Sequence, residues 1–195
     1  AFATPDVARA WLKLLPAGTT WTAERAAYRT LLDKMDDEFV NGAEPGFDLS
    51  ECSDNSCNEW IGAQIRADLY GWVCPGRPGL AAHLAETDAS LSHRGEGVNS
   101  ARFIAALGAA MPAADTIDTA VEIASHEIPS DSEAFDAVTL GRSLHGVFFG
   151  KDTLLICLDA LQECKYSQSG GYHHCDTNPR DPVAHAPPRC AARFC

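Results

Sequence analysis

The residues of this 195-residue chain with the clearest potential for chemistry lie in one block near its middle. The block reads Ser92-His93-Arg94-Gly95-Glu96-Gly97-Val98 and is followed by Asn99. Its two glycines precede an apolar helical pattern over residues 98–111, and glycine lets a backbone approach a ligand closely. Helix N-terminal N–H groups suit phosphate oxygens, and His93 could hydrogen-bond a phosphate or a ribose. The alternative is that His93 caps a helix and the glycines only make the turn.

A second group of potential ligands lies near the C-terminus. It comprises Cys157, Cys164, His173, His174, Cys175, Cys190 and Cys195. Structural zinc sites use close pairs such as Cys-x₂-Cys, whereas the successive cysteine gaps here are 7, 11, 15 and 5 residues. The indication of zinc is therefore weak, and we assign no metal ligand. The sequence also has no nucleophile elbow, P-loop or His-Glu-x-x-His motif, so we assign no catalytic residue.

The net charge of the chain argues against some classes of binding partner. Lys and Arg number 15 against 27 Asp and Glu, which gives a net charge of −12. This excess argues against a nucleic acid or an anionic membrane as the main partner. No apolar run approaches the roughly 18–20 residues that span a bilayer, and no leader is visible at the start. We therefore expect a cytoplasmic protein.

The composition changes sharply near residue 150. Residues 151–195 carry 5 basic and 5 acidic residues, and they hold five of the eight cysteines and four of the eleven prolines. Such a break usually marks a boundary. We expect a helical domain over residues 1–146 and a divergent or disordered Cys-, His- and Pro-rich tail over residues 147–195. Whether the tail is native or frame-shifted stays open.

Apolar spacing of three and four residues predicts an all-α fold. The expected helices cover residues 4–15, 22–35, 60–74, 80–85, 98–111, 117–124, 133–138 and 154–161. Thr4-Pro5-Asp6 reads as a cap and first turn, and Ser130-x-x-Glu133 as a capping box. Residues 36–58 contain no Lys or Arg and many turn residues, which predicts a solvated acidic loop. Trp60 and Trp72 are expected in the core. Small residues within 101–111 predict close helix packing.

Three blocks follow one another in the middle of the chain: Asn-Glu-Trp-Ile-Gly-Ala-Gln-Ile-Arg-Ala-Asp at 58–68, Pro75-Gly76, and the Ser-His-x-Gly-x-Gly block. Their sequence and order resemble the central part of the ADP-ribosylglycohydrolase family, which includes J-crystallin-like proteins. The likeness covers roughly residues 8–138. Residues 21–29, Pro129 and Ser132 extend it.

The resemblance implies an all-α, magnesium-dependent hydrolase. Such enzymes cleave the glycosidic bond between ADP-ribose and a modified side chain or small molecule. The partner expected from the resemblance is ADP-ribose or an ADP-ribosylated substrate. The residues that would bind it are Ser92, His93, Gly95, Glu96, Gly97 and Asn99.

Two metal-binding blocks of that family are missing. They are a Thr/Ser-Asp-Asp block near the N-terminus and an Asp-x-Asp-Thr/Ser block near the C-terminus. Asp36-Asp37-Glu38 reads better as a solvated helix end, and Cys175-Asp176-Thr177-Asn178 lacks the second aspartate. We therefore expect a fragment or an inactive copy of such a hydrolase. The alternative is a non-catalytic module that binds ADP-ribose or serves a crystallin-like structural role.

Overall fold

The computed structural model describes residues 2–16 and 18–147, and all regular structure in these ranges is helical. The elements are α1 (Thr4–Leu14), α2 (Thr22–Lys34), α3 (Asp37–Val40), the 3₁₀ turn η1 (Leu49–Ser53), α4 (Gly62–Arg66), α5 (Asp68–Val73), α6 (Pro78–Ala89), α7 (Gly95–Ala110), α8 (Ile117–Ser125) and α9 (Glu133–Val147). The expected all-α fold is confirmed. The helix expected at 154–161, the possible zinc ligands and residues 148–195 of the expected tail lie outside the described residues.

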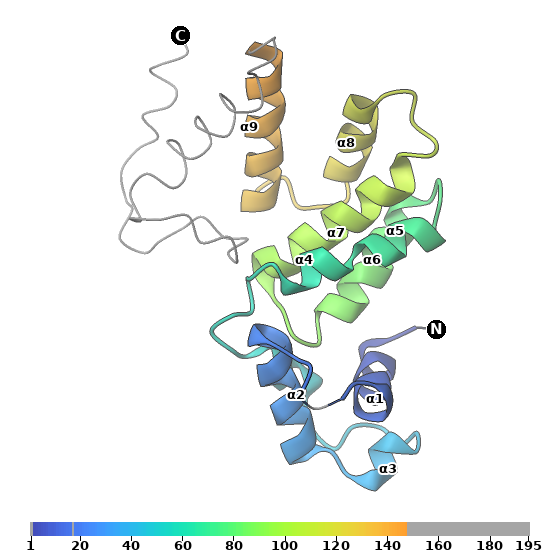
Figure 1. Cartoon of the computed structure of the whole chain (residues 1–195), viewed down its shortest axis with the longest axis vertical. Coiled ribbons are helices and arrows are strands. Elements are labelled where there is room, and N and C mark those ends of the chain that lie inside the picture. The colour runs from blue at the N-terminus through green and yellow to red at the C-terminus, as the bar shows by residue number, and fades with distance from the viewer. Residues whose placement is uncertain (1, 17, 148–195) are drawn as a thin grey trace.

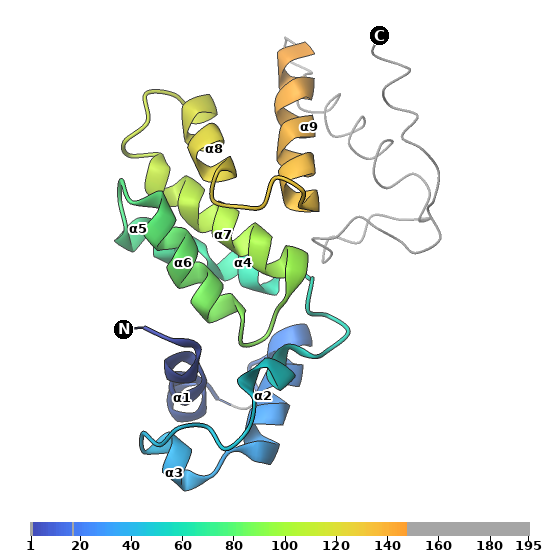
Figure 2. The same ribbon diagram turned by 180° about the vertical axis from the view of Figure 1, so that it is seen from behind.

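The helix α7 is the centre of the arrangement. It packs against α4, α5, α6 and α8. The helices α1, α2 and α3 lie at one end of the molecule, and α8 and α9 lie at the other (Figure 1, Figure 2). No helix in the described part is both long and apolar enough to cross a bilayer.

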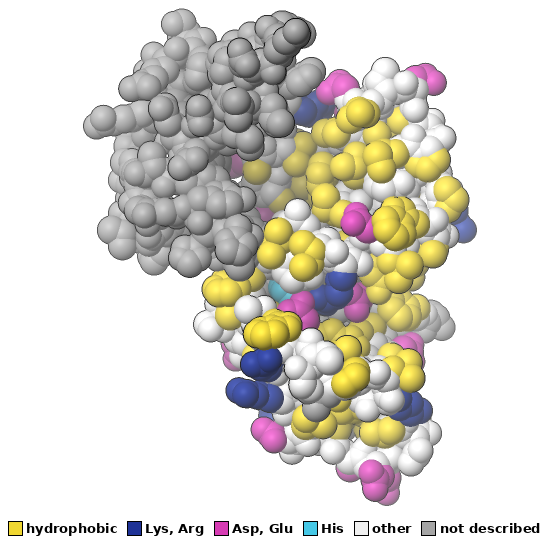
Figure 3. Space-filling view, viewed as in Figure 1, with side chains coloured by type: hydrophobic (Ala, Val, Ile, Leu, Met, Phe, Trp, Pro, Cys, Tyr) yellow, Lys and Arg dark blue, Asp and Glu magenta, His cyan; other side chains and the backbone are white. Residues whose placement is uncertain are grey.

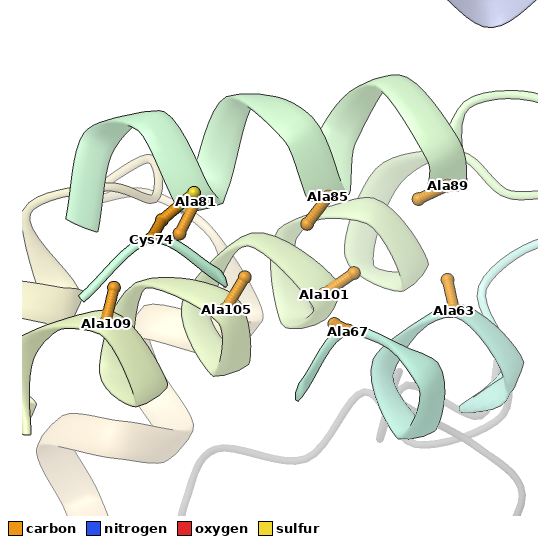
Figure 4. Packing of buried hydrophobic residues seen from close by; sticks show 9 residues of the cluster. All are labelled: Ala63, Ala67, Cys74, Ala81, Ala85, Ala89, Ala101, Ala105 and Ala109. Carbon is orange, nitrogen blue, oxygen red and sulfur yellow. The ribbon is translucent and has the colours of Figure 1, made fainter. Parts of the chain in front are cut away.

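The core around α7 is built mainly from alanine. Figure 4 shows side chains of α4, α6 and α7 facing one another, with Cys74 beside them. The alanines are Ala63, Ala67, Ala81, Ala85, Ala89, Ala101, Ala105 and Ala109, each at most 1% exposed. Because methyl groups fill little space, the helix axes come close together. The expected small-residue stripe is therefore confirmed as a packing surface.

A second core cluster joins the N-terminal elements. It includes Val7, Ala27, Leu31, Phe39, Cys52 and Leu91. Phe39 and Cys52 are each 1% exposed and come from the segment expected to be a solvated acidic loop. That prediction was wrong in part, because α3 and η1 bury their apolar side chains against α1 and α2 while the acidic ones face water. Asp36 caps α3 by accepting a hydrogen bond from Phe39 N (2.8 Å), so it is a helix end as expected.

The prediction of one amphipathic helix over residues 60–74 was also wrong. The segment divides at Ala67 into α4 and α5, and its buried residues are Ala63, Ala67, Gly71 and Cys74. The large apolar side chains point outward, with Ile65, Leu69 and Trp72 exposed by 67%, 55% and 70%. Figure 3 shows hydrophobic side chains gathered where α4 and α5 reach the surface. The three-and-four spacing was correct, but the smaller residues face the core.

Two helix starts differ from the expected caps. Thr4 is the first residue of α1, not its cap, and its hydroxyl donates to Thr87 O of α6 (3.1 Å). Ser132, not Ser130, caps α9, since its Oγ accepts from Phe135 N (3.1 Å). Both helices are where the sequence predicts them, but the capping groups lie one or two residues away.

Candidate functional site

Ser92 and His93 lie in the short connection between α6 and α7. The N–H groups of both residues donate to Ala89 O, at 3.0 Å and 2.8 Å, so the chain turns tightly after α6. Ser92 is fully buried and His93 is 1% exposed. The turn therefore presents both side chains to the interior, beside α2 and α4.

Arg66, at the end of α4, gathers the polar groups around this turn. Its Nη1 donates to Glu24 Oε1 of α2 (2.5 Å), its Nε to Asp88 Oδ2 of α6 (2.7 Å) and its Nη2 to Ser92 Oγ (3.2 Å). The guanidinium is an exclusive donor, so all three partners accept. One side chain thus connects three helices and the Ser92–His93 turn.

These contacts determine which nitrogen of His93 carries the proton. Ser92 Oγ lies 2.8 Å from His93 Nδ1. Because Ser92 is buried and its oxygen accepts from Arg66, its own hydroxyl hydrogen is directed to Nδ1. Burial and the nearby Arg66 charge lower the pKa of His93 to about 3, which keeps the ring neutral. The neutral ring therefore carries its hydrogen on Nε2.

The Nε2 atom of His93 is buried and has no hydrogen-bond partner. The nearest acidic oxygen is Glu24 Oε1 at 3.9 Å, which is too long for a direct hydrogen bond. An unsatisfied buried donor costs about 1–3 kcal/mol, so native proteins rarely leave one without a purpose or a bound molecule. This atom is the strongest indication of a ligand in the described residues.

The start of α7 is hydrogen-bonded to residues 58–59, which lie much earlier in the chain. Arg94 N donates to Asn58 O (2.9 Å), and Glu96 N donates to Glu59 Oε1 (3.3 Å). Gly95 has φ of +46°, which favours glycine. A Cβ on Gly97 would lie 2.6 Å from Asn58 O, so this glycine permits close approach of protein backbone. Both glycines lie inside the first turn of α7, not ahead of the helix as expected.

Glu96 and Asn99 are engaged with each other and with α9. Asn99 Nδ2 donates to Glu96 Oε1 (3.2 Å), and Ala134 N donates to Glu96 Oε2 (2.9 Å). The carboxylate thus satisfies an N–H group in the first turn of α9 and ties this helix to α7. The structure brings Ser92, His93 and Gly97 together, and it places Glu96 and Asn99 toward α9.

Four residues around this site were not predicted from the sequence: Glu24, Glu59, Arg66 and Asp88. Arg66 and Glu24 are 42 residues apart, and only the packing of α2 on α4 joins them. One signal was present, since Arg66 stands between the apolar residues Ile65 and Ala67. A partly buried charge in such a place needs a partner.

The fit of this cluster to magnesium is poor. Glu24 and Asp88 both already accept from Arg66, whose positive charge opposes a cation at the same place. Within the described ranges, no three His, Cys, Asp or Glu side chains lie close enough together to hold a metal ion. Among the described residues, Cys52, Cys57 and Cys74 are free thiols.

Comparison with known sequences adds one match. The ADP-ribosylglycohydrolase family matches residues 2–173, which is most of the chain. The match continues past residue 146, where we expect the domain to end, and so includes the first part of the expected tail. No curated protein and no solved structure matches the chain. Since the family match spans more than half of its residues, the chain belongs to the ADP-ribosylglycohydrolase family.

Proposed function

We propose that this protein binds ADP-ribose, either free or attached to another molecule, at the Ser92–His93 turn. The family implies ADP-ribose-related substrates and is generally metal-dependent. The observation that carries the proposal is the buried Nε2–H of His93, which has no partner in the described structure. Phosphate and ribose oxygens accept hydrogen bonds from such a donor.

We further propose that this chain binds ADP-ribose but has little or no hydrolase activity. Cleavage of the glycosidic bond in this family relies on metal-bound oxygen ligands, and the described residues do not assemble them. The carboxylates next to His93 are committed to Arg66. The protein would then act as a hydrolase-related module that recognises ADP-ribose, whether as a fragment or as an inactive copy.

Isothermal titration calorimetry with ADP-ribose tests the binding proposal. We expect the full chain to bind with measurable heat, with and without magnesium. The variant H93F is expected to weaken binding at least tenfold, because it keeps an aromatic ring but removes the Nε2–H donor. The matched control is H83Q, at an exposed histidine on α6. Absence of heat with the wild-type chain would refute the proposal.

Release of ADP-ribose from ADP-ribosylated arginine tests the second part. We expect little or no release by the purified 195-residue chain at any magnesium concentration. Rapid, magnesium-dependent release would show that the chain is an active hydrolase and that residues outside the described ranges supply its ligands.

A further inference from the structure

The gap between Glu24 and His93 has a definite chemical polarity. Glu24 Oε1 is an acceptor and His93 Nε2 is a donor, and they lie 3.9 Å apart. Because these two atoms are only 3.9 Å apart, one oxygen atom can lie about 2.8 Å from both of them. The bridging group must accept from Nε2–H and donate to the carboxylate.

A hydroxyl group meets both requirements, because it offers one O–H donor and two acceptor lone pairs. A phosphodiester oxygen only accepts, and it would face the carboxylates of Glu24 and Asp88 with one guanidinium between them. The cluster therefore carries more negative than positive formal charge, which disfavours an anion. The local chemistry favours a sugar hydroxyl over a phosphate.

We propose that Glu24 and His93 together bind a single sugar hydroxyl, with Glu24 as the hydrogen-bond acceptor and His93 as the donor. Arg66 and Ser92 determine which of the two accepts and which donates. The proposal rests on ADP-ribose binding at this turn and names the part of the ligand that the turn recognises. A water molecule in the same gap would be displaced by the hydroxyl without loss of hydrogen bonds.

The supporting residues hold each half of the pair in place. Arg66 donates to Glu24 Oε1 and to Ser92 Oγ, so one guanidinium orients the acceptor directly and the donor through Ser92. Gly62 lets the α4 backbone lie against the Glu24 carboxylate, since a Cβ there would come within 2.9 Å of Glu24 Cδ. Arg66 and Ser92 are thus positioning residues that need not touch the ligand.

Calorimetry on four variants of the full chain tests the pair. We expect E24Q and H93F each to weaken ADP-ribose binding about tenfold or more. The double variant should lose much less than the product of the two single losses, because both residues bind the same hydroxyl. The matched control for E24Q is E44Q, which removes a carboxylate charge at an exposed position and leaves Arg66 and the pair intact.

If E44Q weakens binding as much as E24Q, the loss reflects net charge and the proposal is overturned. It is also overturned if the wild type binds ADP-ribose and neither E24Q nor H93F changes its affinity; ADP-ribose binding itself would then stand. Melting temperatures of all four variants show whether any loss is due to unfolding.

Smaller probes identify which sugar supplies the hydroxyl. ADP carries only the adenosine ribose, and ribose 5-phosphate stands for the second one. We expect the affinity of one of these probes to fall in both E24Q and H93F. Binding of inorganic pyrophosphate that depends on His93 would instead show a phosphate contact and overturn the proposal.

The tautomer of His93 tests the positioning role of Ser92. Long-range ¹H–¹⁵N spectra should show a protonated Nε2 and an unprotonated Nδ1 in the wild-type chain, with the signals assigned by their loss in H93Q. We expect S92A to weaken ADP-ribose binding, because Nδ1 loses its hydrogen-bond donor and the ring is no longer held in place. S92T should keep the wild-type tautomer and affinity because it retains the hydroxyl. An Nδ1-protonated ring in the wild type would overturn the assigned polarity.

Discussion

Gly71 of α5 and Gly108 of α7 lie against each other with no room for a side chain. A Cβ on Gly71 would come within 2.9 Å of Gly108 Cα and of Ala105 O. Both neighbouring atoms belong to the α7 backbone, which cannot rotate away as a flexible side chain can. The α5–α7 contact therefore depends on glycine at position 71. This contact holds α5 beside the alanine core, which also includes residues of α4, the helix that ends at Arg66.

Gly71→Ala is expected to destabilise the protein by about 1–3 kcal/mol, because the added methyl group must push α5 away from α7. Gly141→Ala is the matched control: it lies in α9 with nothing within 4 Å of its Cβ position, and it should be neutral or stabilise by up to about 1 kcal/mol. Chemical denaturation monitored by circular dichroism measures both. Equal stabilities for the two variants would mean that α5 and α7 do not pack this closely.

Gly97→Ala should disturb the site more than the fold. The new Cβ would lie 2.6 Å from Asn58 O and 3.1 Å from His93 Cδ2, so the Asn58 backbone or the His93 ring must move. We expect ADP-ribose affinity to fall at least tenfold together with a loss of about 1–3 kcal/mol of stability. Gly46→Ala, where nothing lies within 4 Å, should change neither quantity. Calorimetry and thermal melting give the two readouts, and unchanged affinity in G97A would separate this turn from the ligand site.

The helices of this protein were predictable, but the faces they bury were only partly so. Periodic apolar residues define α1, α2 and α6, and the Ser92–His93 block is recognisable as a motif. In α4 and α5 the same periodicity placed Trp72 in the core, although it is 70% exposed. Alanine and glycine bury little area per residue, so a core made of them gives a weak hydrophobic signal beside a large exposed tryptophan.

The charged cluster was hidden for a different reason. Asp88 and Arg66 are 22 residues apart, and Glu24 lies on another helix, so no local spacing rule connects the three. Their association results from helix packing, which the order of residues along the chain does not encode in a simple pattern. The segment at 36–58 was hard to assign for a similar reason, since Phe39 and Cys52 are buried by tertiary contacts and not by a periodic face.

Glu96 is expected to stabilise α9 without contacting ADP-ribose. Both of its carboxylate oxygens already accept, from Asn99 Nδ2 and from Ala134 N. Glu96→Gln presents an NH₂ group to one of these donors, so we expect a loss of about 1 kcal/mol of stability and an ADP-ribose affinity within about twofold of wild type. Glu44→Gln, at an exposed position, is the control for loss of charge. A tenfold weaker affinity in E96Q with unchanged stability would instead support the ligand contact that the sequence suggests.

His93 should make stability depend on pH between about 6.5 and about 3. Its pKa falls from 6.5 to about 3 on folding, chiefly through burial and then through Arg66. In this window the unfolded chain binds a proton at His93 that the folded chain does not, so the contribution is complete above about pH 6.5 and is lost as the pH falls. Glu24 faces the ring at 3.9 Å but is paired with Arg66.

The measurement is the free energy of unfolding of wild type and H93Q at several pH values between 4 and 7. Carboxylates titrate in both proteins, so the difference between the two curves isolates His93. We expect this difference to change by up to about 1.4 kcal/mol per pH unit below the unfolded pKa, with the wild type losing stability faster on acidification. H83Q, at an exposed histidine, is the control for loss of a histidine. Parallel curves for wild type and H93Q would mean that folding does not lower the pKa of His93.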